Sequence, residues 1–102
     1  MEIDYKHALA DADALARLKA LGDYLAHKHG IQVTWENDQK AVFHGKYLVV
    51  RIDGELTLEP GAAHFHGKDP GFLWRKKASD YIRGKLEAYL DPATALDDLP
   101  RS

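Results

Sequence analysis

The sequence predicts an α+β protein of two layers, in which two helices cover one face of an antiparallel sheet. Two segments, 14–29 and about 71–89, place apolar residues at helical spacing. The residues before and between them alternate apolar and polar, which is typical of half-buried strands. Because helices and strands each have one apolar face, the order β-α-β-β-β-β-α favours two packed layers. We expect a single domain over residues 1–90 and a flexible C-terminal tail over residues 91–102.

The first strand and the first helix follow from two local patterns. Residues 2–9 alternate, and the inward face of this predicted strand carries Ile3, Tyr5, His7 and Leu9. The acids of Asp11–Asp13 are the expected N-cap of the helix. Gly30 is its expected end, because glycine readily adopts the left-handed conformation that often follows a helix. His27 and His29 in the last turn complement the negative end of the helix dipole, which explains them without a site.

Residues 31–67 are predicted to form an antiparallel meander, and side-chain alternation tests where its turns lie. A three-residue loop over Asn37–Gln39 keeps the apolar residues of the flanking strands on one face. A turn at Pro60–Gly61 does the same for the last two strands.

Two glycines decide the register of the strands in the middle. A turn at Gly45–Lys46 pairs Phe43 with Leu48 and leaves Tyr47 on the outer face. A turn at Asp53–Gly54 would instead exchange the two faces of the strand. We therefore predict one long strand that is bent or bulged at Gly54.

Composition excludes several classes of function. The net charge of -2 argues against a nucleic-acid partner, because phosphate contacts need a surplus of Lys and Arg. No apolar run approaches the roughly 20 residues of a membrane span, and the acids near the N-terminus do not fit a secretory signal. We therefore expect a cytoplasmic protein with no membrane span. The absence of cysteine excludes thiol catalysis, and we expect no cofactor.

Six histidines are the one unusual feature of the composition. Alternation places His44, His64 and His66 on the outer face of the sheet, with His66 opposite Glu55 and His64 opposite Thr57. Two histidines and a carboxylate on one strand face are a set of ligands that zinc, nickel or copper would accept. Solvated strand histidines explain the same pattern, so we predict no metal site. A metal-dependent hydrolase that uses these outer histidines stays an alternative.

The inward-facing side chains indicate a second candidate site. A small ligand-binding domain that resembles a helix-grip fold, with the sheet curved around the last helix, would have an apolar cavity. The predicted lining of that cavity is Tyr5, His7, Trp35, Phe43 and Tyr81. No serine or acid is spaced to form a catalytic group with His7, which is either a hydrogen-bonded structural residue or a ligand contact.

A cluster of cations begins the second helix and is a candidate partner-binding surface. It consists of Trp74, Arg75, Lys76 and Lys77. Cations in a first turn oppose the helix dipole, so solvent, acids such as Asp69 and Asp80, or an acidic partner must offset them. The outer sheet face, which has some apolar character, is a candidate homodimer seam.

Several short motifs together resemble one bacterial family. They are the strand Ile3-x-Tyr5-x-His7-x-Leu9, the helix start Ala14-Leu15-Ala16-Arg17-Leu18, His29-Gly30 before Val33-Thr34-Trp35, Phe43, a strand that contains Gly54, Gly71-Phe72-Leu73 and a final amphipathic helix. Over residues 2–90 the chain resembles the polyhydroxyalkanoic acid system proteins, also described as polyhydroxyalkanoate granule-region proteins. It departs from the family pattern around residues 60–70 and in the acidic tail.

The resemblance implies a link to polyester storage and carries over no catalytic residue. We expect a non-enzymatic accessory protein whose partner is the polyester granule surface, a granule protein or a hydrophobic acyl ligand. The helix-grip-like ligand-binding domain and the metal-dependent hydrolase are the alternatives.

Overall fold

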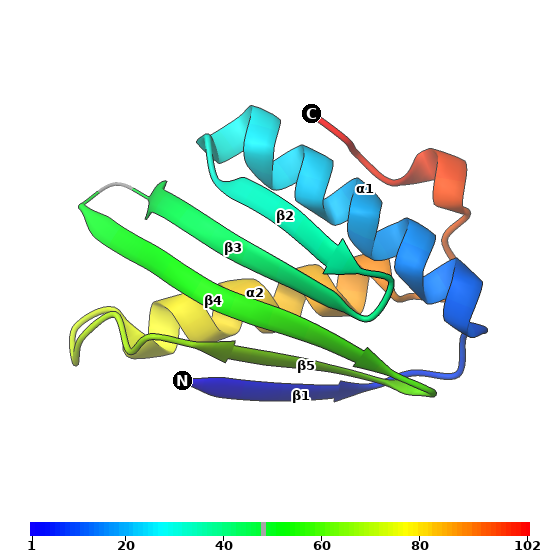
Figure 1. Ribbon diagram of the computed structural model, residues 1–102, viewed down its shortest axis with the longest axis horizontal. Helices are drawn as coiled ribbons and strands as arrows, with labels where there is room; N and C mark the ends of the chain where they lie inside the picture. The colour runs from blue at the N-terminus through cyan, green and yellow to red at the C-terminus, as the bar shows by residue number, and fades with distance from the viewer. Residues whose placement is uncertain (48) are drawn as a thin grey trace.

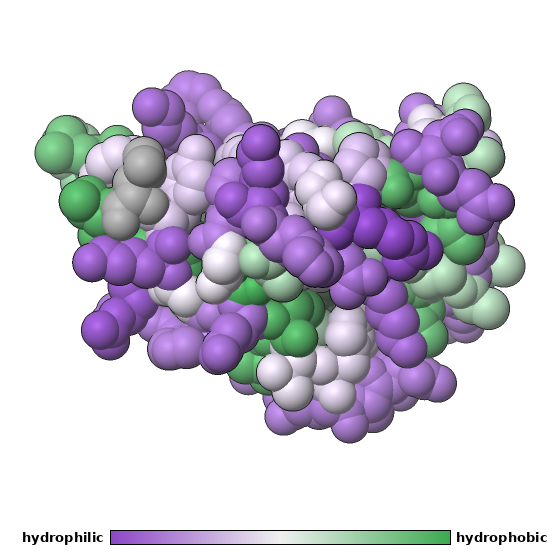
Figure 2. All heavy atoms as spheres, turned by 90° about the horizontal axis from the view of Figure 1, so that it is seen from above, coloured by the Kyte–Doolittle hydropathy of each residue, from purple (hydrophilic) through white to green (hydrophobic). Residues whose placement is uncertain are grey.

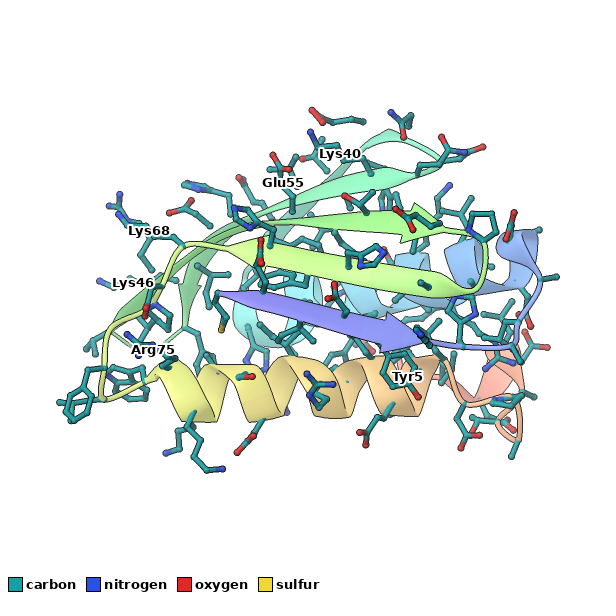
Figure 3. The ribbon with its side chains drawn as sticks, turned by 90° about the horizontal axis from the view of Figure 1, so that it is seen from below. Tyr5, Lys40, Lys46, Glu55, Lys68 and Arg75 are labelled. Carbon is teal, nitrogen blue, oxygen red and sulfur yellow. The ribbon has the colours of Figure 1, made fainter. Side chains whose placement is uncertain are left out.

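A computed structural model describes residues 1–47 and 49–102. Its elements are β1 (Glu2–Lys6), α1 (Asp11–His29), β2 (Gln32–Asn37), β3 (Lys40–Tyr47), β4 (Val50–Glu59), β5 (Ala62–Gly67), α2 (Arg75–Tyr89) and the short 3₁₀ helix η1 (Leu96–Asp98). Both long helices lie on the same face of one five-stranded sheet (Figures 1 and 3). The predicted α+β fold and its element order are confirmed.

The sheet has the strand order β1-β5-β4-β3-β2, and every neighbouring pair is antiparallel. Strands β2 to β5 form the predicted meander, and β1 adds to the far edge beside β5 (Figure 1). The predicted registers at two turns are correct, because Trp35 pairs with Ala41 and Leu58 pairs with Ala63. Strands β1 and β2 are therefore the two opposite edges of the sheet.

The predicted turn at Gly45–Lys46 is wrong, because β3 continues through both residues to Tyr47. Tyr47 pairs with Val50 and Phe43 pairs with Gly54. The predicted partner of Phe43, residue 48, lies outside the described residues. Gly45 is small for a packing reason, since a Cβ added there would lie 3.0 Å from the Cα of Ile31. Tyr47 consequently lies on the helix-covered face and not on the outer face.

Strand β4 is continuous at Gly54, with neither a turn nor a bulge there. The rejection of a turn at Asp53–Gly54 is confirmed, and the predicted alternative of a bulge is wrong, since the pairing with β3 is continuous from Val50 to Thr57. The reason for a glycine here is the ring of Phe65. A Cβ added at Gly54 would lie 2.6 Å from the Phe65 Cζ.

Helix α1 begins after Ala10 and ends at Gly30, and only its C-terminal end was predicted correctly. Its N-cap is Ala10, with no side-chain cap, so the predicted capping role of Asp11–Asp13 is wrong, and Asp11 and Asp13 lie inside the first turn. The predicted C-terminal signal is confirmed: Gly30 has a φ of 69° and its N–H donates to the carbonyl of Ala26. The buried stripe of α1 faces the sheet and includes Leu18, Leu21 and Leu25.

Helix α2 begins at Arg75, later than the predicted start near Pro70–Gly71. Gly71 has a φ of 100°, which fits a turn and not a helix. The carbonyl of Gly71 accepts hydrogen bonds from the N–H groups of Trp74 and Arg75. Phe72 and Leu73 are therefore placed in a loop.

Within the described residues, no helix is long and apolar enough to cross a membrane.

Residues 91–102, predicted as a flexible tail, lie beside α1 (Figure 1). Leu99 is buried in the same core as α1. The buried guanidinium of Arg17 donates to the carbonyls of Asp91 at 2.9 Å and Tyr89 at 3.3 Å. The Tyr89 hydroxyl donates to the carbonyl of Pro100 at 2.5 Å. None of these contacts was predicted from composition, which indicates only that the segment is polar and rich in small residues.

Candidate functional site

An apolar groove opens between the start of α2 and the helix-covered face of the sheet. Its volume is about 240 Å³. The aromatic residues that line the groove are Tyr47 of β3, Trp74 at the N-cap of α2 and Tyr81 within α2. Its aliphatic lining includes Ile31, Ile52 and Ile82. Helix α2 packs against β1 and α1 and presents the small side chain of Ala78 to the groove, so this side of the sheet is incompletely covered.

A smaller cavity of about 70 Å³ adjoins the groove and shares four lining residues with it. It extends inward to the rings of Phe43 and Phe65, which meet edge-to-face with centroids 6.0 Å apart. Its exposed lining surface is entirely apolar. Together the two spaces approach the lower end of the range of about 300–1,000 Å³ for small-molecule sites.

The polar groups of the groove centre on a pair formed by His29 and Tyr81. The Nε2 of His29 lies 3.0 Å from the Tyr81 hydroxyl. Tyr47 completes the cluster, with its ring 4.8 Å from the His29 ring and stacked on Tyr81 at 6.1 Å. The ammonium of Lys85 lies 5.4 Å from the centre of the Tyr81 ring.

Burial sets the protonation of this pair. Burial, with the nearby phenols of Tyr24, Tyr47 and Tyr89, raises the pKa of Tyr81 to about 12. Burial lowers the pKa of His29, and the positive charges of Lys28 and Lys85 lower it further. Both groups are therefore neutral at pH 7. Among the described residues that line the groove and the adjoining cavity, none is a carboxylate. This chemistry suits binding better than acid–base catalysis.

The five residues predicted to line one cavity do not come together. Phe43 and Tyr81 line the same cavity. Tyr5 lies on β1 and Trp35 on β2, at the opposite edges of the sheet. Figure 3 places Tyr5 beside the C-terminal half of α2, away from the end of the helix where the groove opens.

His7 lies beyond the end of β1 and has local contacts. The imidazole Nδ1 of His7 accepts a hydrogen bond from the backbone N–H of Leu9 at 3.1 Å. The backbone N–H of His7 donates to the carbonyl of Gly61 at 2.9 Å. Its Nε2 is buried without a hydrogen-bond partner among the described residues. The residue does not line the groove.

Each histidine on the outer face of the sheet lies beside a carboxylate, and these groups do not form a metal site. His44 lies 2.6 Å from Asp53, and His66 lies 3.1 Å from Glu2. The predicted register is correct, with His66 opposite Glu55. However, Glu55 forms an ion pair with Lys40 at 3.5 Å (Figure 3). Within the described residues, no three His, Asp or Glu side chains are grouped so that they could hold a metal ion.

His64 has the strongest charge environment of the three. Its Nδ1 lies 2.6 Å from the Asp4 carboxylate, which β1 brings alongside, and its Nε2 lies 3.2 Å from Glu59. The hydrogen bond to Asp4 and the nearby carboxylate of Glu59 raise the pKa of His64. The bond to Asp4 depends on β1 pairing with β5, which the sequence does not reveal.

Two of the three cations at the start of α2 are offset by the acids that the sequence suggested. Arg75 lies 2.7 Å from Asp69, which lowers the pKa of that carboxyl, and Lys76 lies 2.7 Å from Asp80, which raises the pKa of the lysine. The ammonium of Lys77 lies 5.7 Å from the centre of the Trp74 ring. Lys77 and Trp74 are the members of this predicted surface that line the groove.

A second feature beside the groove is an apolar tip, which consists of Val49, Phe72, Leu73 and Trp74. Phe72 and Leu73 are 84% and 82% exposed, and Val49 is 77% exposed. The end of β3, the start of β4 and the loop before α2 lie at the same end of the molecule (Figure 1), where hydrophobic atoms gather on the surface (Figure 2). Lys46, Lys68 and Arg75 lie at this end too (Figure 3).

The sequence contained a signal for the tip, because three consecutive large apolar residues follow the turn residues Pro70–Gly71. Assigning that run to the helix concealed it. The contribution of His29 and Tyr47 to the groove had no such signal. The sequence explains His29 as a helix-end residue, and the predicted turn at Gly45–Lys46 places Tyr47 on the outer face.

The family of the chain follows from its sequence over this whole fold. A family model described as "Putative polyhydroxyalkanoic acid system protein" matches residues 1–93, from β1 to just beyond α2. The chain belongs to this family. The resemblance noted in its motifs is thereby confirmed. Comparisons with curated proteins and with solved structures give no match.

Proposed function

We propose that this protein is a non-enzymatic accessory protein of polyester storage that binds the granule surface through its apolar tip, in the cytoplasm. The observation that carries the proposal is the distribution of exposed apolar side chains. Of the large hydrophobic residues that are exposed among the described residues, Val49, Phe72 and Leu73 belong to the tip, and Tyr47 and Tyr81 line the adjoining groove. Such clustering marks an interaction surface, whereas scattered exposed residues need no explanation.

The composition of the tip suits an apolar surface in water. Burying one large apolar side chain contributes about 1.5–3 kcal/mol, so Phe72 and Leu73 together supply several kcal/mol toward the cost of association. Lys46 and Lys68 flank the tip, and neither forms an ion pair within the described residues. Apolar side chains bordered by cations are typical of proteins that lie on an amphiphilic interface.

Sedimentation with polyester granules tests the proposal. Granules stripped of protein and granules with their native coat should both carry the wild-type chain into the pellet. The double substitution Phe72→Ser/Leu73→Ser should weaken binding at least tenfold, because it removes most of the exposed apolar area. The control Ala12→Ser/Ala93→Ser, at exposed positions toward the other end, should bind like wild type.

Three results would contradict this proposal. Equal binding of the tip variant and wild type would show that the tip is not the contact. Binding only to coated granules would assign the contact to a granule protein. A wild-type dimer that the tip substitution dissociates would assign the tip to a second copy of the chain.

The groove favours a second candidate function, a small hydrophobic-ligand-binding domain. Its volume of about 240 Å³ and its mainly apolar lining are the specific observation. The neutral probe 1-octanol should shift the NMR signals of Ala78 and Ile82, and Ala78→Leu, which fills the groove, should abolish the shifts. No shift in the wild type would reject this candidate.

A further inference from the structure

The charges around the groove have one sign. Lys77 lines the groove near its mouth, and Lys85 lines the adjoining cavity. The remaining polar side chains of the groove are those of His29, Tyr47 and Tyr81, and no described lining residue is an acid. A ligand with a cationic head would meet only like charge here, whereas an anionic head would be attracted.

Lys77 is the cation of this cluster that lines the groove and has no carboxylate partner within the described residues. Its neighbours Arg75 and Lys76 are held by carboxylates at 2.7 Å. Lys77 has the face of Trp74 as its neighbour and forms no ion pair within the described residues. The hydroxyl of Tyr81 is already hydrogen-bonded to His29, so this pair forms a wall of the groove and does not serve as a second anchor.

The volume limits the length of the ligand. A methylene group occupies roughly the 30 Å³ that a water molecule takes in the liquid. The groove of about 240 Å³ therefore has room for roughly eight carbons. The inner cavity leads on to Phe43 and Phe65, which gives the tail an apolar end to point toward.

We propose that the groove binds an aliphatic monocarboxylate of roughly eight carbons, with its carboxylate at the Lys77 ammonium and its tail along Ile52 and Ile82. The proposal rests on the second candidate function and adds the chemical class and the orientation of the ligand. The carboxylate–ammonium contact determines the polarity of the chain in the groove. The apolar walls supply most of the binding free energy.

Three eight-carbon probes that differ only in their head groups test the ligand class. Titrations followed by NMR should give the affinity order octanoate, then 1-octanol, then octylammonium. Lys77→Met should weaken octanoate binding about five- to tenfold, as expected for a partly exposed ion pair, and should leave octanol binding unchanged. Lys76→Met is the matched control, because that lysine lies one residue away and is paired with Asp80, and it should change neither.

The outcomes separate this inference from the function on which it rests. Equal binding of octanol and octanoate, or no effect of Lys77→Met, would overturn the carboxylate assignment and leave a ligand-binding domain. Failure of all three probes would reject both. Butanoate should bind weakly, and dodecanoate should bind no better than octanoate. A steady rise with chain length would overturn the assignment to a groove of limited size. Unfolding midpoints of each variant establish that it is folded.

Discussion

Alanine at Gly54 should destabilise the protein, although alanine usually suits a strand better than glycine. The added Cβ would lie 2.6 Å from Phe65 Cζ and 3.2 Å from the carbonyl oxygen of His66. Phe65 is 6% exposed and packs edge-to-face on Phe43, so its ring cannot move aside freely. Overpacking of this kind costs about 1–3 kcal/mol, and the lower entropy of the unfolded alanine chain returns about 0.4–1 kcal/mol. The expected net loss is about 1–2 kcal/mol.

Gly84 provides a control with the same substitution and the opposite sign. It lies in α2, and a Cβ added there has no neighbour within 4 Å. Alanine should therefore stabilise the protein by about 0.5–1 kcal/mol. The two effects add to about 1.5–3 kcal/mol, and 1 kcal/mol corresponds to about 4–8 °C for a domain of this size, so the Tm values of the two variants should differ by roughly 6–24 °C. Circular dichroism during heating, with urea unfolding for the free energies, measures the difference.

A double-mutant cycle identifies the cause. In a Phe65→Leu background the ring is gone, so the cost of Gly54→Ala should fall by at least half. If Gly54→Ala leaves stability unchanged, or costs the same without the Phe65 ring, then the explanation of this glycine as a packing residue is wrong.

Two further predictions concern contacts that tie distant segments together. Arg17→Met should lower the free energy of unfolding by about 1–3 kcal/mol in urea, because the buried carbonyl of Tyr89 loses its donor. Asp13→Asn keeps a side-chain oxygen that can accept from Arg17 Nε, so it should cost less than Arg17→Met. His64 has a raised pKa, so its ion pair with Asp4 stabilises the fold fully below pH about 6.5 and loses this effect as the pH rises through the raised value. The stability difference between wild type and His64→Gln should therefore be larger at pH 6 than at pH 9, and an equal difference at both would contradict the assignment.

Side-chain alternation predicts faces well but cannot choose between turns that preserve them. A turn at Gly45–Lys46 and the observed pairing of Tyr47 with Val50 both keep Phe43 and Ile52 on the inner face. They differ only in the residues between, and the predicted turn therefore places Tyr47 on the outer face. Alternation did exclude a turn at Gly54, because that turn exchanges the faces of the strand.

Glycine itself is ambiguous in a sequence. The absence of a Cβ permits a turn, a bulge or the close approach of a neighbour, and a glycine in the sequence does not show which of the three applies. At Gly45 the neighbour is Ile31, and at Gly54 it is Phe65. Both neighbours are distant along the chain, so neither local pattern could reveal that these glycines serve packing.

The five residues predicted to line one cavity lie apart for a different reason, namely the position of the first strand in the sheet. Tyr5 and Trp35 do face the helix side, as alternation indicates. The first strand could join either edge of the meander, and no local pattern decides which. It pairs with β5, which separates Tyr5 from Trp35 by the width of the sheet and brings Asp4 to His64.

The tip and the groove adjoin each other, so the two proposed functions are linked. Trp74 belongs to the tip and also lines the groove, and Lys77 lines the groove one helical turn away. A surface seated on Phe72 and Leu73 would cover this mouth and would exclude a ligand whose head lies at Lys77. Saturating octanoate should therefore reduce granule binding in the sedimentation assay. Ala78→Leu fills the groove and leaves Phe72 and Leu73 unchanged, so octanoate should not alter the granule binding of this variant. Octanoate that reduces binding of both proteins equally would show that it acts on the granule and not on the groove.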